Sequence, residues 1–273
     1  MRSYLQRINQ KISAVRMRWD VKRGLPVRFT TRGKNYWVNA DGSAMYHIVN
    51  STGKIAKMAD LIPRSTQTIF DVGANCGLFS AFASLASPGA SIYCFEPSSE
   101  LLPIIDRNVS RDRVSVHGVA VGDSDGQVEL FVNTKSQQTN SLNKSAVELF
   151  AQPGNVQSRM VDCIRLDTFA EGKGIQKIDV LKVDVQGYEG AVFRGCGDLV
   201  STVEMLFVES TWMDIESIVE TIPFALEHGF THVSVLNPVH MGADIILSRR
   251  KINSPYIKID FPISKELLVR RWM

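Results

Sequence analysis

Two kinds of spacing between apolar residues divide the chain. Near the N-terminus, apolar residues recur every three or four positions from Leu5 to Trp19, and Lys or Arg occupy many of the places between them. This spacing is typical of an amphipathic helix. Residues 25–38 alternate on either side of Arg32-Gly33-Lys34, which predicts a β-hairpin. A further helix is expected to lead to Leu61-Ile62-Pro63, where the proline closes it.

From residue 68 onward, short apolar strands alternate with helices, which predicts βαβ units around a parallel sheet. Asn237-Pro238 separates the last two apolar runs, so these are expected to close the sheet as an antiparallel hairpin. Residues 133–158 are polar and predict a long loop with one short helix, of the kind that often binds ligands. The expected strands are Thr68–Val72, Ser91–Glu96, Val114–Val121, Gln127–Val132, Ile178–Val185, Met205–Glu209, Phe230–Leu236 and Ala243–Ser248, and the expected helices are Leu78–Ala86, Ser98–Asn108 and Ile215–His228.

The overall composition says little about function, whereas the distribution of charge along the chain is more informative. The 273 residues are 44% hydrophobic and 22% charged, as in a soluble globular protein with a sizeable core. The net charge of +3 is too small to imply a nucleic-acid partner. Residues 1–23 contain seven Lys or Arg and one acid, Asp20, so the basic character belongs to the N-terminus.

This basic N-terminal stripe has two interpretations. It packs against its own domain or a second subunit in a homo-oligomer, which we favour, or it contacts an anionic membrane surface as a peripheral anchor. No apolar run approaches the roughly 18 residues of a membrane span, and no secretory signal is evident. Four widely spaced cysteines fit a reducing compartment. We therefore expect a cytoplasmic protein, with peripheral contact to the inner face of the membrane as the alternative.

A glycine-rich turn follows the first strand of the α/β region, with the sequence Asp71-Val-Gly73-Ala-Asn75-Cys-Gly77. Glycines allow a tight turn and a close approach of the backbone to a ligand. A dinucleotide fingerprint would place glycine at position 75 and glycine or alanine at position 78, where this chain has Asn75 and Leu78. The turn therefore favours a ligand without a pyrophosphate, and Asp71 suits the ammonium group of a methionine moiety.

An acid, Glu96, ends the second strand of this region. A carboxylate in that place can accept hydrogen bonds from both hydroxyls of a ribose. The alternative is a carboxylate at a strand end with no ligand. The order and spacing of Gly73 and Glu96 favour a binding site.

Several linked motifs resemble the FkbM family of S-adenosylmethionine-dependent methyltransferases, from about Thr68 to Arg249. The most specific is Asp179-Val-Leu-Lys-Val-Asp-Val-Gln-Gly-Tyr-Glu189, in which Gln186 stands where the family commonly has Glu. The other motifs are Phe70–Gly77, Phe95–Pro97, Ala120–Asp123 with Gly126, Asn140–Leu142, Arg165–Phe169, Phe193–Gly195 and Asp244–Leu247.

The resemblance implies a Rossmann-like class I methyltransferase fold: a seven-stranded, mostly parallel sheet with a closing antiparallel hairpin in three α/β/α layers. It implies O-methylation of a hydroxyl on a sugar, glycan or secondary metabolite, with S-adenosyl-L-methionine as cofactor. A glycolipid acceptor is included in that class. By motif match the cofactor would be held by Asp71, Gly73, Asn75, Gly77 and Glu96, with Val119, Ala120 and Asp123 near the adenine.

The acceptor side is predicted from the ends of later strands. Asp184 ends the fourth strand, and Lys182, two residues earlier, faces the same side of the sheet. A lysine in an apolar strand needs a partner, so a Lys182–Asp184 pair is expected. Glu189, in the first turn of the next helix, and Glu209, at the end of the fifth strand, complete the catalytic candidates. The alternative for Asp184 is a purely structural ion pair.

Other candidates are weaker. Trp212 could stack on a sugar or pack in the core, His240 could act as a base, and Cys76 is expected to be a packing residue. No His, Asp or Glu set has convincing metal spacing, so no metal is expected. A non-catalytic binding or scaffold protein on the same fold, or an NAD(P)-dependent oxidoreductase, remains the alternative function. We predict an N-terminal extension at residues 1–50, a methyltransferase domain at 51–251 and a tail at 252–273.

Overall fold

The computed structural model describes residues 23–41, 44, 48, 52–211, 215–236, 242–257 and 259–263. The predicted N-terminal amphipathic helix, Trp212 and His240 lie outside the described residues. Within the described part of the chain, no helix is both long enough and apolar enough to cross a membrane.

The central sheet has eight strands in the order β13-β11-β12-β10-β9-β3-β4-β5. The five from β10 to β5 are parallel, whereas β12 runs antiparallel to both β10 and β11. The predicted mostly parallel sheet with its closing hairpin is thus confirmed as seven of these strands. The eighth, β13, comes from the predicted tail and pairs with β11. The bounds are β3 Thr68–Val72, β4 Ser91–Phe95, β5 Val114–His117, β9 Val180–Val183, β10 Met205–Thr211, β11 His232–Val235, β12 Gly242–Ser248 and β13 Ile259–Pro262.

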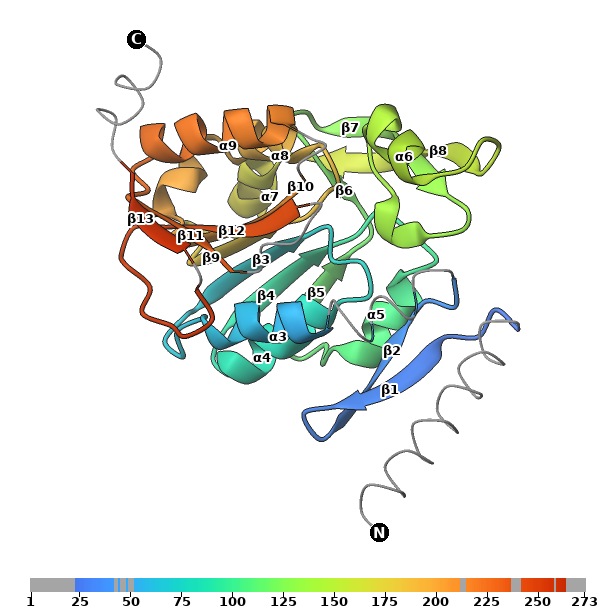
Figure 1. Ribbon diagram of the computed structural model, residues 1–273, viewed down its shortest axis with the longest axis horizontal. Coiled ribbons are helices and arrows are strands. Elements are labelled where there is room, and N and C mark those ends of the chain that lie inside the picture. Colours follow the sequence, from blue (N-terminus) through green and yellow to red (C-terminus); the bar gives the residue numbers. More distant parts are fainter. Residues whose placement is uncertain are drawn as a thin grey trace.

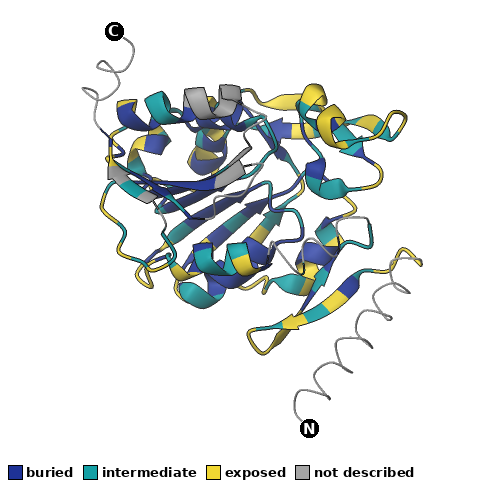
Figure 2. Ribbon diagram, viewed as in Figure 1, coloured by how far each residue is buried: buried dark blue, intermediate teal, exposed yellow. Residues whose placement is uncertain are grey.

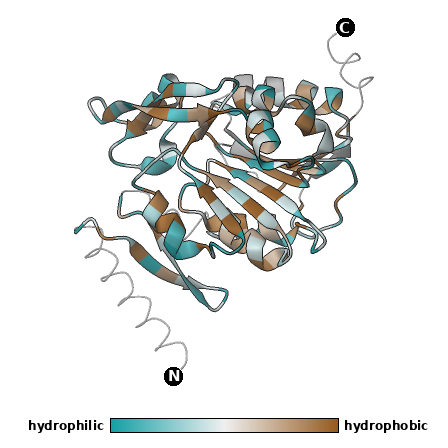
Figure 3. Cartoon of the chain, turned by 180° about the vertical axis from the view of Figure 1, so that it is seen from behind, coloured by the Kyte–Doolittle hydropathy of each residue, from teal (hydrophilic) through white to brown (hydrophobic). Residues whose placement is uncertain are grey.

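Helices cover both faces of this sheet, which gives the predicted three layers (Figure 1). The strands between them are buried (Figure 2) and apolar (Figure 3). On one face, Phe79 of α4 packs against Phe207 of β10, and on the other Phe169 of α7 packs against Phe70 of β3. One face carries α3 Thr52–Asp60, α4 Leu78–Ala86 and α5 Leu102–Asn108, and the other carries α7 Leu166–Lys173, α8 Glu189–Cys196, the 3-10 helix η3 Gly197–Thr202 and α9 Ile215–Glu227.

The N-terminal hairpin is confirmed as β1 (Val27–Thr31) and β2 (Lys34–Val38). It forms its own two-stranded sheet and packs on the helical layer, since Tyr36 stacks edge-on against Phe82 of α4 with ring centroids 5.1 Å apart. Asn108 of α5 accepts from the Trp37 backbone N–H and donates to its carbonyl. The hairpin therefore shares a core with the domain that follows it.

A second, smaller sheet lies beside the central one, with strand order β6-β8-β7. The predicted strand Val114–Val121 was wrong as a single element, because the chain leaves the central sheet after His117 and β6 (Ala120–Val121) pairs with β8 (Val156–Ile164) instead. The first three residues of β8 had been assigned to the long loop. The rest of this side sheet is β7 Gly126–Asn133, the 3-10 helix η2 Gln137–Thr139 and the predicted short helix, α6 Lys144–Phe150.

Candidate active site

The glycine turn and the end of β9 meet at the centre of the sheet. Here β4 and β9 lie on opposite sides of β3, the point where the strand order reverses and open α/β sheets bind ligands. A Cβ on Gly73, which has φ +71°, would lie 1.9 Å from the carbonyl oxygen of Asp184. Lys182 donates to the Gly73 carbonyl at 2.6 Å. Only glycine allows this contact between the two chain segments.

The rest of the glycine turn folds against the end of β4. The backbone N–H groups of Gly73 and Ala74 both donate to the Phe95 carbonyl, at 3.1 and 3.0 Å. Asn75 adopts a left-handed conformation (φ 51°), and its side chain accepts from the N–H of Cys76. An asparagine tolerates this backbone region better than most residues. The turn therefore reaches α4 with the N–H of Asn75 directed toward Glu96.

Glu96 is held between two backbone amides. Its Oε2 accepts from the N–H of Asn75 at 2.8 Å, and its Oε1 accepts from the N–H of Ser98 at 2.9 Å. Burial raises the pKa of Glu96 to about 7, although the two amides oppose that rise. Each carboxylate oxygen can accept more than one hydrogen bond, so the fixed carboxylate retains capacity for two ligand hydroxyls.

Asp71 lies behind the turn and is fully buried. Its Oδ2 accepts from the hydroxyl of Ser80 at 2.7 Å and from the Ser80 N–H at 3.2 Å, and its Oδ1 is 3.2 Å from the Lys182 ammonium. Asp71 and Lys182 are register partners across β3 and β9. These contacts support the turn from below, and the predicted contact of Asp71 with a ligand ammonium stays a prediction.

The acceptor-side candidates Asp184 and Glu209 come together through Gln186. Its amide donates to Asp184 Oδ1 at 2.8 Å and to Glu209 Oε2 at 2.6 Å. Gln186 has a left-handed backbone (φ 56°), a strained state for this residue type. The predicted Lys182–Asp184 pair is present at 3.6 Å. Residue 186 thus contributes an amide that bridges two acids.

The two acids carry different charges. Although burial opposes it, the Lys182 ammonium and the neighbouring Glu209 hold the pKa of Asp184 well below its usual range. Burial and the Asp184 carboxylate raise the pKa of Glu209 to about 8, against the influence of Lys54. Asp184 is therefore the ionised member of the pair, and Glu209 keeps a proton near neutral pH.

Two residues of this cluster were not among the sequence candidates. The ammonium of Lys54, on α3, lies 2.5 Å from Glu209 Oε1 and 2.6 Å from Asp244 Oδ1. Glu209 and Asp244 are register partners across β10 and β12. Asp244 stands in a motif that was read only as a strand, and Lys54 precedes every motif, so no local signal pointed to either.

Glu189 is buried and turns back onto its own loop. Its carboxylate accepts from the N–H of Val185 at 3.2 Å and from that of Gly187 at 3.1 Å. Burial raises the pKa of Glu189 to about 7. The side chain therefore shapes the loop after β9 by binding its amides.

Val119, Ala120 and Asp123 are the residues predicted to lie near the adenine. Their described contacts are with the core and with α8, and not with the glycine turn. Ala120 is buried in β6, Val119 packs against the main core, and Asp123 pairs with Arg194 of α8 at 3.0 Å. Their contact with adenine stays a prediction.

The four cysteines are buried and free, and burial raises the pKa of Cys76 to about 12, as expected of a packing residue.

One turn of the side sheet bonds to both ligand-side loops. Asn140 donates to the Ser98 hydroxyl at 3.0 Å, Ser141 donates to the Val185 carbonyl at 3.1 Å, and Asn143 donates to the Gly187 carbonyl at 3.1 Å. Asn143 also caps α6. The loops beside Glu96 and after Asp184 are therefore fixed to each other through this turn.

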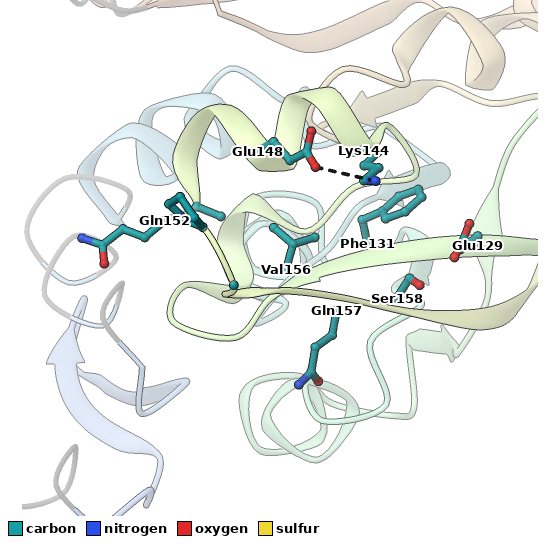
Figure 4. Close-up of a pocket in the computed structure, with 11 residues that line it drawn as sticks. Glu129, Phe131, Lys144, Glu148, Gln152, Val156, Gln157 and Ser158 are labelled. Atoms are coloured by element: carbon teal, nitrogen blue, oxygen red, sulfur yellow. Dashed lines mark ion pairs between the residues drawn. The ribbon is translucent and has the colours of Figure 1, made fainter.

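A pocket of about 620 Å³ lies between α6 and the β7–β8 ribbon (Figure 4). Lys144 and Glu148 form an ion pair of 3.7 Å at its rim, and Phe131 supplies an aromatic face. The lining also includes Glu129, Ala151, Gln152, Pro153, Gly154, Val156, Gln157 and Ser158. The mixture of amide, hydroxyl, charged and aromatic groups suits a polar organic molecule.

The sheet order, the glycine turn and the acid after β4 define a Rossmann-like methyltransferase. The chain belongs to the methyltransferase FkbM domain family, whose sequence profile matches residues 71–231. The family membership predicted from the motifs is confirmed, and S-adenosylmethionine is the cofactor that this membership supports.

Several curated proteins are similar to this chain. The 31-O-demethyl-FK506 methyltransferase FkbM of Streptomyces tacrolimicus is 26% identical over 207 residues, which are 67% of this chain and 79% of that protein. The 2-O-methyltransferase NoeI of Sinorhizobium fredii is 24% identical over 56% of this chain and 67% of its own length. The hexuronic acid methyltransferase AglP of Haloferax volcanii is 26% identical over 52% and 54%, respectively.

Proposed function

We propose that the chain transfers a methyl group from S-adenosylmethionine to a hydroxyl oxygen of a sugar, glycan or secondary metabolite. The observation that carries this proposal is the meeting of two sites at one sheet edge. The glycine turn and Glu96 follow the ends of β3 and β4, while Asp184 follows the end of β9 and Glu209 lies near the end of β10.

The residues at this edge fit the proposed cofactor. Glu96 is fixed by two amides and suits the ribose hydroxyls. The ionised Asp184 suits the ammonium of the methionine part, and Gly73 and Gly77 keep Cβ atoms out of the turn. Asp71 would act from behind, by orienting the turn through Ser80 and Lys182. We include Asn75, Val119, Ala120 and Asp123 in the proposed cofactor site on the motif match alone.

When bound, the cofactor supplies a methyl group on a positively charged sulfur that leaves readily as a thioether. The protein therefore needs chiefly to align the acceptor oxygen. Positioning can contribute about 7–11 kcal/mol, whereas a general base contributes about 10²–10⁴-fold. Glu209 is our candidate for the group that accepts the hydroxyl proton, in the ionised form that it reaches as the pH rises through its pKa of about 8. Glu189 would shape the loop that carries Asp184.

Two similar proteins and the pocket support the proposed acceptor class. One similar protein is named as a hexuronic acid methyltransferase and another as a 2-O-methyltransferase. The pocket beside α6 offers amides, acids, a lysine and Phe131, which suits the hydroxyls and apolar faces of a sugar-like molecule. We place the remote part of the acceptor there.

Binding of S-adenosylhomocysteine by calorimetry tests the cofactor site. We expect micromolar affinity, lost in Glu96→Ala and in Gly73→Asp, with folding checked by circular dichroism. Transfer of labelled methyl from S-adenosylmethionine to a panel of sugars and hydroxylated metabolites then tests the reaction. The absence of heat from well-folded protein would reject the proposal, and cofactor binding without transfer would favour the non-catalytic alternative.

Location and partners belong to the same proposal. We propose a cytoplasmic enzyme whose residues 1–23 pack on its own domain or on a second copy. Sedimentation with liposomes, with and without anionic lipid, separates this from peripheral membrane contact.

A further inference from the structure

Lys54 stands outside the segment that matches the family, yet it completes the cluster of acids at the acceptor side. Glu209 and Asp244 face each other across β10 and β12, and once Glu209 is ionised, like charges in these directly opposed positions would destabilise the sheet. The ammonium of Lys54 lies between them, within 2.6 Å of both. A purely structural role for Lys54 would consist only of this compensation of charge.

Two observations extend the role of Lys54 beyond charge balance. The Lys54 side chain is 22% exposed and that of Glu209 is 25% exposed, although Asp244 behind them is 3% exposed. An ammonium has three N–H groups, and among the described residues that of Lys54 pairs with two carboxylates. One N–H therefore remains for a ligand at a partly open edge of the sheet.

The strained backbone of Gln186 also supports a functional role for this cluster. Its amide fixes Glu209 next to Asp184, so the cluster is rigid on the side away from Lys54. Backbone strain of this kind is concentrated at functional sites. A fixed cation and a fixed carboxylate side by side form a pair that can bind one hydroxyl by its oxygen and by its proton.

We propose that Lys54 binds the acceptor oxygen of the reaction proposed above, while Glu209 takes the hydroxyl proton. An oxygen lone pair forms the new bond to the methyl carbon, and the electrons of the broken carbon–sulfur bond stay on sulfur. The proton moves from the acceptor oxygen to the Glu209 carboxylate. Lys54 stabilises the negative charge that develops on oxygen, the task for which other enzymes use a metal ion or an oxyanion hole.

The charged groups around Glu209 define the first test. They are Lys54 from α3, Lys182 and Asp184 from β9 and its loop, and Asp244 from β12. Removal of the Lys54 charge should raise the pH at which Glu209 loses its proton. We expect Lys54→Met to lower kcat about 100-fold and to move the rise of rate with pH to higher pH. Lys54→Arg should keep the wild-type profile, and ethylammonium should restore part of the rate of Lys54→Ala.

Controls separate this role from a structural one. The affinity for S-adenosylhomocysteine should change little in Lys54→Met, whereas the melting temperature should fall, because the buried Asp244 loses its ion pair with Lys54. A rate lost together with cofactor affinity, or a pH profile that does not move, would refute the proposal. If Lys54→Met does not fold, Lys54→Gln replaces it, because its amide retains two donors.

A spectroscopic test does not need an acceptor. Carboxyl-labelled glutamate, with the Glu209 resonance assigned through Glu209→Gln, reports the titration of that group in the complex with S-adenosylhomocysteine. We expect Lys54→Met to shift it to higher pH. An unshifted titration would refute the role of Lys54 even in an active enzyme, whereas a shifted titration in a protein without transfer would count against the proposed function alone.

Discussion

Gly73 is the residue at which the contact between the two ligand-side segments is most sensitive to a single methyl group. In Gly73→Ala the added Cβ would lie 1.9 Å from the Asp184 carbonyl oxygen and 2.9 Å from its carbon. Cβ atoms do not approach other heavy atoms within 3.0 Å, so the ends of β3 and β9 must separate by about 1 Å. The neighbour is backbone, held by the bond from the Asp184 N–H to the Val72 carbonyl, and cannot rotate away.

The cost of Gly73→Ala has two parts. A left-handed backbone costs a residue with a Cβ about 1–2 kcal/mol. Overpacking adds about 1–3 kcal/mol. The expected loss in the free energy of unfolding is therefore about 2–5 kcal/mol.

Gly174→Ala is the matched control, because Gly174 has φ +68° and a Cβ there would meet no atom within 4 Å. It should lose only the backbone part, about 1–2 kcal/mol. Urea unfolding followed by circular dichroism measures both variants, and calorimetry with S-adenosylhomocysteine should show binding lost in Gly73→Ala alone. Equal losses of stability in the two variants would refute the close contact between Gly73 and Asp184.

Two further predictions concern the two ligands. The pKa of Glu96 is raised to about 7, so this residue is protonated below that pH and ionised above it. S-adenosylhomocysteine should therefore bind about tenfold more tightly at pH 8 than at pH 6. Glu96→Gln should remove this pH dependence, and a wild-type affinity that does not depend on pH would contradict the prediction. Phe131→Ala, in the pocket beside α6, should raise the acceptor KM severalfold without changing kcat or cofactor affinity. The control Leu149→Ala, at an exposed position of α6 that does not line the pocket, should leave KM unchanged, and an equal effect of both would exclude the pocket as an acceptor site.

The central sheet was predictable because four of its five parallel strands, β3, β4, β9 and β10, are apolar runs that a helix follows. Thr68–Val72 and Leu78–Ala86 have the predicted bounds. The side sheet was harder to predict from the sequence. β8 carries Gln157, Ser158 and Arg159 at its start, and these polar residues form a strand only because β7 pairs with them across the whole ribbon. Such pairing depends on a distant partner and leaves no signal in the local sequence.

The candidate site shows the same division. Asp184, Glu209 and Lys182 were found because each stands at or near the carboxyl end of a recognisable strand. In the sequence, Gln186 was noted only as a glutamine at a position where the family commonly has Glu. The bridge that its amide forms depends on a left-handed backbone conformation, which the sequence does not reveal. Lys54 reaches the site from a helix that precedes the motifs, by a contact over 155 positions of the chain.

The turn Asn140–Asn143 gives the molecule a modular character. The side sheet and α6 line the proposed acceptor pocket, and this turn bonds them to the loops beside Glu96 and after Asp184. An exchange of residues 144–158 with those of a relative would therefore replace the lining of the pocket except for Glu129 and Phe131, and would leave the junction with the cofactor loops intact. If the acceptor binds in this pocket as proposed, substitutions in the ribbon would change the acceptor and leave the contacts between the turn and the cofactor loops in place.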